Sequence, residues 1–256
     1  MAMGATGVPD DDAKRRFQRL QAAHFAEADR AKFLWQTTNA YLAGTERALL
    51  GLAGIRPADR LLEIGCGEGG NLELLATTPD RTVGVDFSEG KVRWAARHVG
   101  RARFVCADAR RLPFRNGAFD IVLCRDVLHH VTDKGAVIEE MIRVCGAAGR
   151  LAVIEPNGRS PIMWLLGALV PAERDLMRNS LPRLKPLLER RSLANGGVHW
   201  AQPCPLGRVL FHYRWGLPRL AGRLGPLMLG FERRLGRCIP SGYWAYIVLT
   251  AVKRAT

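Results

Sequence analysis

Short apolar runs alternate with amphipathic segments through the middle of this chain. Five runs have the character of buried strands, at 60–65, 82–86, 102–108, 119–127 and 149–156. Apolar positions recur with helical spacing between them, at 71–79, 88–99 and 134–145. Ser88 is placed to cap the second of these helices. Short strands that alternate with helices indicate βαβ units and a parallel sheet covered on both faces.

The segments on either side of this core have a different pattern. Residues 10–53 carry apolar positions at helical spacing, and the stretch beyond Pro156 is rich in Leu, Arg and Pro. A β-branched and aromatic run at 241–254 reads as a last strand. We therefore expect a helical N-terminal cap at 1–54, an α/β core at 55–157, a helical basic region at 158–240 and a final strand of the core sheet at 241–256.

Composition adds an expectation about the cellular compartment. The 256 residues contain no run of 18 uncharged apolar residues, and the first residues lack the apolar stretch of a secretion signal. Six cysteines are scattered without C-x-x-C spacing. We expect a reduced, cytoplasmic chain without a metal site.

The net charge of +14 is concentrated in the last part of the chain. Residues 156–256 hold 16 Lys and Arg against 4 Asp and Glu, a balance of +12, whereas residues 1–155 have a balance of only +2. One interpretation is an arginine-rich surface that is simply solvated. The other is contact with an anionic partner, either a membrane surface or a nucleic acid.

Candidate chemistry begins at the stretch LLEIGCGEGG, residues 61–70. Its glycines at 65, 67 and 70 have the G-x-G-x-x-G spacing of a loop that joins a strand to a helix and lets a ligand approach bare backbone. Asp86 follows 21 residues after Gly65, at the end of the next strand, where a carboxylate can accept hydrogen bonds from two ribose hydroxyls. These features suit any ligand that contains adenosine.

Three details favour a ligand other than NAD. Glu63 lies two residues before the first glycine, and a carboxylate there suits a cationic group better than a pyrophosphate. About 60 residues precede the loop, although dehydrogenases of this type more often open with it. Asp108 ends the third strand, where an acidic side chain can hold an exocyclic amine.

Taken together, five motifs in this order resemble the class I S-adenosylmethionine-dependent methyltransferases with a type-11 domain. The resemblance covers residues 55–157 and rests on LLEIGCGEGG, VGVDFSE, CADARRLPF, FDIVLCRDVLHHV and RVCGAAGRLAVIEPN. It implies a doubly wound, Rossmann-like sheet of seven strands whose last strand is antiparallel. It also implies S-adenosyl-L-methionine (SAM) as the cofactor.

The resemblance also implies roles for individual residues. The methionine end of SAM would be held by Glu63, Gly65, Cys66 and Gly67, the ribose by Asp86, and adenine by Phe87, Asp108 and Ala109. Arg125 would face the sulfonium end. The family's usual Pro-Gly-Gly turn is replaced by Ala147-Ala148-Gly149, and we expect Gly146 and Gly149 to supply the turn instead.

His129 and His130 in the LHH motif are the candidates for a general base, with Arg125 beside them. The alternative is that the two histidines only shape the pocket. Directly after the fourth strand there is neither an Asn/Asp-Pro-Pro-Tyr/Phe motif nor a Pro-Cys pair, which disfavours methylation of a nucleobase.

We therefore expect methyl transfer to a hydrophobic or lipid-like small molecule, such as a secondary metabolite, quinone or lipid. Tryptophan, leucine and arginine in the last third suit peripheral contact with the inner, anionic face of a membrane. RNA methylation through the same basic region is an alternative, with nucleic acid the less favoured partner. A nucleotide-binding oxidoreductase or a non-catalytic SAM-binding module is a third hypothesis.

Overall fold

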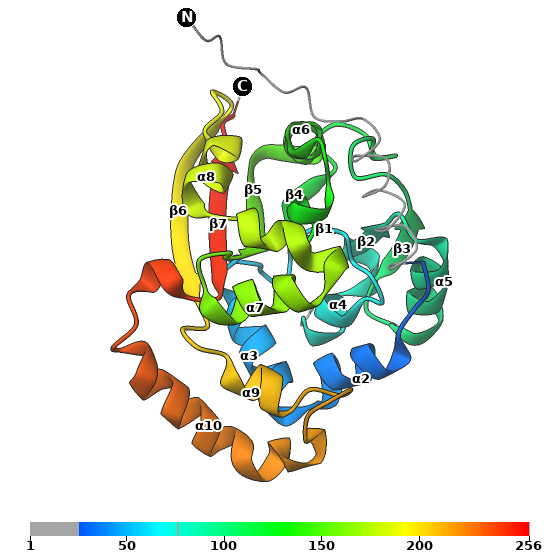
Figure 1. Ribbon diagram of the computed structural model, residues 1–256. Coiled ribbons are helices and arrows are strands. Elements are labelled where there is room, and N and C mark those ends of the chain that lie inside the picture. Colours follow the sequence, from blue (N-terminus) through cyan, green and yellow to red (C-terminus); the bar gives the residue numbers. More distant parts are fainter. Residues whose placement is uncertain (1–25, 76, 256) are drawn as a thin grey trace, which may run out of the picture.

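The computed structural model describes residues 26–75 and 77–255 of the chain, which surround one mixed sheet (Figure 1). The strand order is β3-β2-β1-β4-β5-β7-β6. The first five strands of the chain pair in parallel, and β7 runs antiparallel to both β5 and β6. The strands are β1 (Leu61–Ile64), β2 (Thr82–Asp86), β3 (Arg103–Cys106), β4 (Phe119–Arg125), β5 (Cys145–Pro156), β6 (Leu193–Ala201) and β7 (Tyr246–Lys253). The predicted fold class, a seven-stranded Rossmann-like sheet with an antiparallel last strand, is confirmed.

Helices cover both faces of this sheet. They are α2 (Arg30–Thr38), α3 (Ala40–Gly51), α4 (Gly70–Leu74), α5 (Glu89–His98), α6 (Lys134–Val144), α7 (Pro161–Leu169), α8 (Leu181–Leu188), α9 (Leu206–Leu210) and α10 (Ala221–Gly236). The predicted helices at 88–99 and 134–145 are confirmed, and Ser88 caps α5 by accepting a hydrogen bond from the Lys91 amide. The helix predicted at 71–79 ends at Leu74, ahead of Pro79.

Two apolar cores follow from the alternation of side chains along each strand. Leu62 and Val122 point into a core with Met141 of α6. The neighbouring positions, Leu61 and Ile121, point into a second core on the opposite face, which α3, α4 and α7 share. Central strands are therefore apolar at nearly every position, as expected of a sheet buried on both faces.

The region at 158–240 is not purely helical, and that prediction is wrong in one element. Residues Leu193–Ala201 form β6, which pairs with β7 at the edge of the sheet. The stretch LANGGVHWA gives a weak strand signal because its two glycines have no side chain to continue the alternation. At these glycines the pairing register with β7 shifts, between Ala194 and Gly197. The final strand also begins later than predicted, at Tyr246.

Two further predictions concern the ends of the core. Helices α2 and α3 confirm the helical prediction for the segment before the glycine loop, while residues 10–25 lie outside the described residues. At the turn inside β5, the left-handed residue is Ala148, with φ of 55°, and neither Gly146 nor Gly149. Gly149 still serves the turn by close approach, because a Cβ there would lie 2.8 Å from the Gly146 carbonyl oxygen.

Candidate functional site

The loop between β1 and α4 depends on glycine at specific positions. Gly65, Gly67 and Gly69 have φ angles of 72°, 52° and 78°, a region that side-chain-bearing residues rarely adopt. A Cβ on Gly65 would lie 2.0 Å from Val127 Cγ2, whereas a Cβ on Gly67 would meet nothing within 4 Å. A Cβ on Gly70, the third glycine of the sequence pattern, would lie 2.4 Å from Gln36 Oε1, the end of a flexible side chain that can move aside. The bare backbone at Gly67 therefore leaves room beside it for a ligand.

This loop borders a cavity of about 490 Å³ at the carboxyl ends of β1 to β4. Ligands of doubly wound folds bind at this edge of the sheet. Nine of the residues predicted from the sequence line the cavity: Gly65, Cys66, Gly67, Asp86, Phe87, Asp108, Ala109, Arg125 and His130. Glu63 and His129 are not among its lining residues. Helices α2 and α3 close the cavity with Trp35, Gln36, Leu42 and Glu46, none of which the sequence motifs pointed to.

Asp86, at the end of β2, holds the glycine loop in place. Its Oδ2 accepts a hydrogen bond from the Gly67 amide at 2.9 Å, and its Oδ1 accepts one from the Ser88 amide at 2.8 Å. Burial raises the pKa of this carboxyl, and the two amide hydrogen bonds act against that rise. Each carboxylate oxygen has a further lone pair. Asp86 can therefore support the loop and also accept hydrogen bonds from a ligand in the cavity.

Glu63 lies beneath the loop on β1 and is fully buried. Its Oε1 accepts a hydrogen bond from Asn71 Nδ2 at 2.6 Å, while Oε2 has no hydrogen-bond partner within the part of the chain that the structure describes. Burial raises the pKa of this carboxyl to about 7. A cationic group close to the unused oxygen would stabilise the charged form of this buried carboxylate.

Asn71 connects Glu63 to a second buried charge, Arg125 at the end of β4. Arg125 Nη1 donates to Asn71 Oδ1 at 2.8 Å, and Arg125 Nη2 pairs with Glu46 of α3. Glu46 also pairs with Arg208 of α9. Burial opposes ionisation of Glu46, but the two guanidinium groups lower the pKa of its carboxyl to about 2.

The position of Arg125 bears on its predicted role beside a sulfonium. Its guanidinium is matched by Glu46 and by Asp126, whose Oδ2 lies 3.3 Å from Arg125 Nε. The positive charge is therefore balanced within the protein and need not repel a cationic ligand. Asn71, Glu46 and Arg208 were missed because their partners are distant in sequence.

Asp108 and its neighbours lie at the outer rim of the cavity. Both oxygens of Asp108 accept hydrogen bonds from Arg110, whose Nη2 is 2.6 Å from Oδ2. If Asp108 binds an adenine amine as predicted, the amine would share the carboxylate with this arginine. Phe87 is exposed over half its surface, and its ring is accessible for stacking on a planar group.

The two histidines of the LHH motif have different surroundings in the short helical turn Leu128–His130. His130 lines the cavity, but His129 is buried with Nδ1 2.7 Å from Glu155 Oε2 and Nε2 3.2 Å from Glu173 Oε2. Burial disfavours its charge, but Glu155 and Glu173 outweigh that effect and raise the pKa of His129 to about 10. An imidazolium whose ring nitrogens both point at carboxylates is poorly placed to accept a proton, so the geometry gives no support to His129 as a base.

His130 has the opposite electrostatic environment. Burial and the charge of His129 lower the pKa of His130 to about 3, so its ring is neutral at pH 7. Glu155 and Glu173 were not predicted as part of the site. The EP dipeptide at the end of the fifth strand was the only signal for Glu155, and Glu173 lies in a region without a recognised motif.

These features fit SAM. The open backbone at Gly67 leaves space for the ligand, Asp86 offers acceptors at the position of a ribose, and Glu63 supplies an unused buried oxygen for the positive end. The cavity volume lies within the range of small-molecule sites, about 300–1,000 Å³.

Comparisons with known proteins agree with this fit. Residues 62–153 match the family model of a methyltransferase domain. Demethylmenaquinone methyltransferase of Beutenbergia cavernae is 35% identical over 145 residues, which are 57% of this chain and 55% of that protein. The 27-O-demethylrifamycin SV methyltransferase of Amycolatopsis mediterranei is 38% identical over 112 residues, 41% of each chain. The chain thus spans about half the length of these curated relatives or less.

Solved structures extend the likeness in fold over nearly the whole chain. An S-adenosylmethionine-dependent methyltransferase of Thermotoga maritima matches with a TM-score of 0.61 at 18% identity, over 94% of this chain and 99% of that one. A phosphoethanolamine N-methyltransferase of Haemonchus contortus, solved with S-adenosylhomocysteine, matches with a TM-score of 0.58 at 18% identity, over 82% of this chain and 52% of that one.

Fold, glycine loop and family model therefore agree. Residues 62–153 match a methyltransferase domain, the fold is that of solved S-adenosylmethionine-dependent methyltransferases, and SAM is the cofactor that the site fits.

Proposed function

We propose that this chain transfers a methyl group from SAM to a hydrophobic small molecule. The observation that carries the proposal is the single cavity in which the predicted SAM-contacting residues and the apolar side chains of α2 and α3 meet. The names of two relatives refer to demethylmenaquinone and to 27-O-demethylrifamycin SV, and both names support an acceptor of this class.

When bound, SAM supplies a methyl group on a sulfonium, which is already activated for displacement. The residues of the chain have to bind and orient the two reactants and exclude water, and such positioning can supply about 7–11 kcal/mol. In the proposal, Asp86 accepts from the ribose hydroxyls, Gly67 lies against the methionine portion and Glu63 balances its positive charge.

The acceptor occupies the part of the cavity bordered by Trp35, Leu42, Val131 and His130 in this proposal. Trp35 is held in place there because its indole Nε1 donates to the Phe211 carbonyl at 2.7 Å. A neutral His130 ring can accept a hydrogen bond from an acceptor hydroxyl and orient it toward the methyl group. A full proton transfer is needed only for acceptors that must ionise before attack.

We further propose that a face of α10 binds an anionic membrane and so brings the chain to lipid-soluble acceptors. Leu220, Leu224, Leu227 and Phe231 recur at spacings of three and four residues, which places them on one stripe of the helix. Leu227 is 72% exposed. Arg219, Arg223, Arg233, Arg234 and Arg237, in or next to this helix, are also exposed.

The position of α10 supports this role. It packs on α3 and α9 at the periphery of the molecule, away from the sheet (Figure 1). An apolar stripe flanked by arginine matches the interface between acyl chains and anionic headgroups. None of the described helices has the length and apolarity needed to cross a bilayer.

The proposal is tested by incubating the chain with SAM and a panel of quinols, phenols and hydroxylated macrocycles. Formation of S-adenosylhomocysteine together with a methylated product, seen by mass spectrometry, is the expected result. The Asp86→Ala variant should lower its rate strongly at limiting SAM, and Asp80→Ala, at an exposed pair with Arg103, should not. Methyl transfer to RNA in place of the small molecules would overturn the proposal.

A further inference from the structure

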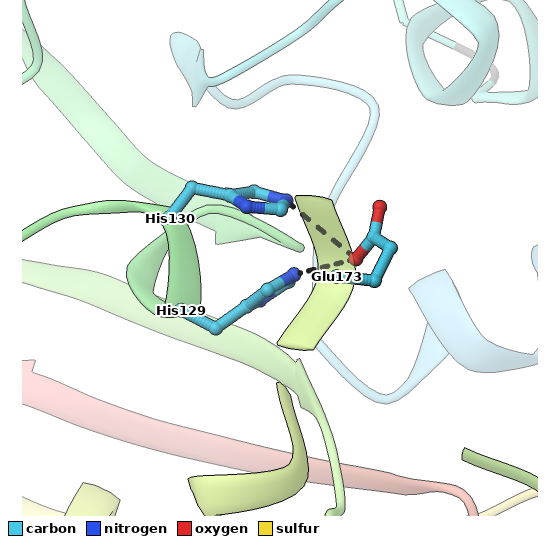
Figure 2. A group of neighbouring side chains, drawn as sticks. All are labelled: His129, His130 and Glu173. Carbon is cyan, nitrogen blue, oxygen red and sulfur yellow. Dashed lines mark hydrogen bonds and ion pairs between the residues drawn. The ribbon is translucent and has the colours of Figure 1, made fainter. Parts of the chain in front are cut away.

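Three side chains from two separate parts of the chain converge beside the cavity. His129 and His130 come from the helical turn Leu128–His130, and Glu173 comes from the turn Pro171–Arg178, which lies against it (Figure 2). One ligand atom from each residue lies within 4.8 Å of the other two. Figure 2 shows both rings pointing their outer nitrogens at the same carboxylate oxygen of Glu173.

Glu155 fixes the orientation of His129. The two oxygens of Glu155 accept hydrogen bonds from the Val127 and Leu128 amides and from Asn179 Nδ2, and Oε2 lies 2.7 Å from His129 Nδ1. The carboxylate is thus immobilised, and His129 Nε2 is directed toward Glu173. A carboxylate behind the inner ring nitrogen is the usual arrangement for a histidine that binds a metal through its outer nitrogen.

The distances within the cluster match a metal site. His129 Nε2 lies 3.2 Å from Glu173 Oε2, and His130 Nε2 lies 3.8 Å from the same oxygen. Ligand atoms bound tetrahedrally to zinc at bond lengths near 2.1 Å are separated by about 3.4 Å. Both distances to Glu173 are close to this value, and all three ligand atoms lie within 4.8 Å of one another, so a metal ion would fit between them after side-chain adjustment.

We propose that His129, His130 and Glu173 bind one divalent transition metal, of which Zn²⁺ is the best match to the donor set. Two imidazoles and one carboxylate with an open fourth position are a known arrangement for zinc. This proposal departs from the prediction of no metal, which considered histidine and cysteine spacing alone. Glu173 lies 44 residues beyond His129, so no local spacing in the sequence could reveal the cluster.

Charge in this region favours a cation. Two carboxylates, those of Glu155 and Glu173, lie 2.7 and 3.2 Å from the ring nitrogens of His129, and the charges of Lys32 and Lys134 also act on them. Lys134 is directed elsewhere, since its Nζ donates to the Leu128 carbonyl. A divalent ion would take the place of the proton on His129 Nε2 and balance both carboxylates.

His130 belongs both to this cluster and to the cavity wall. A metal ion would therefore lie next to the part of the cavity assigned to the acceptor, where its open position, rather than the His130 nitrogen, could bind an acceptor oxygen. That consequence, unlike metal binding itself, rests on the proposed function.

The test uses the full chain after chelator treatment and gel filtration, with Co²⁺ as a spectroscopic probe and Zn²⁺ in competition. Cys106 and Cys238 are exposed thiols and are replaced by serine in every protein of the series, so that they cannot bind metal. We expect one Co²⁺ per chain, with the visible bands of a four-coordinate nitrogen and oxygen site, and displacement of Co²⁺ by Zn²⁺.

Glu173→Gln and His130→Asn should each weaken Co²⁺ binding at least 10-fold and remove the visible bands. His98→Ala, at an exposed histidine on α5, is the matched control and should bind as the parent does. Binding of S-adenosylhomocysteine by the same variants, measured by calorimetry, shows whether each variant is folded. It also tests the cofactor site of the proposed function independently of metal binding. A substoichiometric, featureless spectrum in the parent, or equal binding in all variants, would overturn the metal site.

Discussion

Asp86 is the residue on which cofactor binding should depend most directly. Its carboxylate accepts hydrogen bonds from the Gly67 and Ser88 amides and borders the cavity. Replacement therefore removes both loop support and acceptors for the ribose. Sequence alone predicted only the second of these effects.

We predict that Asp86→Ala weakens binding of S-adenosylhomocysteine by roughly 10- to 100-fold, because two ribose hydrogen bonds contribute about 0.5–1.5 kcal/mol each. Isothermal titration calorimetry measures the change, with Asp80→Ala as the control at an exposed carboxylate. Unaltered affinity in Asp86→Ala would show that the ribose lies elsewhere.

Glu63 should make the stability of the ligand-free protein depend on pH. Burial raises its pKa from an ordinary 4.5 to about 7, so the folded state keeps a proton that the unfolded state releases. This contribution is present at low pH and is lost as the pH rises from about 4.5 to 7, by up to about 3 kcal/mol.

Glutamine cannot ionise, so the comparison with Glu63→Gln isolates this contribution. We predict that the unfolding free energy of the native protein, relative to that of Glu63→Gln, declines between pH 5 and pH 7.5, as measured by urea denaturation. Parallel pH profiles for the two proteins would mean that the Glu63 carboxyl titrates normally.

At the scale of elements, buried ion pairs attach the N-terminal helices and α9 to the sheet. Glu46 of α3 pairs with Arg125 at the end of β4 and with Arg208 of α9, and all three line the cavity. Removing the shared carboxylate would take the ion-pair partner from Arg208 and leave Arg125 with Asp126 alone. Such losses cost about 3–5 kcal/mol.

We predict that Glu46→Gln lowers the unfolding free energy by about 3 kcal/mol. Glu89→Gln, which removes an exposed pair with Arg93 on α5, should leave it unchanged within error. Chemical denaturation followed by circular dichroism measures both. Equal stability of the two variants would mean that the buried pairs contribute no more than surface ones.

At the scale of the whole molecule, α10 is the outer element of the basic last third (Figure 1). The proposed membrane contact requires both the arginines and the apolar stripe. The two contributions can be separated, since salt screens only the first.

We predict that the chain co-sediments with vesicles containing anionic lipid at low salt and much less with neutral vesicles. A double variant, Leu227→Ser with Phe231→Ser, should reduce binding several-fold because both side chains are more than half exposed and can insert into the bilayer. Leu165→Ser, an equally exposed leucine on α7, is the control. Binding of the double variant at the parental level would remove the role of α10.

The sequence by itself determined the parallel half of the sheet and the cofactor. Apolar strands and helical spacing are local patterns, and the glycine loop with Asp86 is read along a single βαβ unit, so both can be recognised without coordinates. Strand β6 escaped recognition because its glycines and bulge hide the alternation that marks a strand.

Only the tertiary structure decided which side chains meet. It placed Glu46, Arg208 and Glu173 beside Arg125 and the two histidines, and it separated His129 from the cavity that His130 lines. These contacts join residues up to 162 positions apart. Their energies depend on burial and on distances across the fold, which no local pattern in the chain encodes.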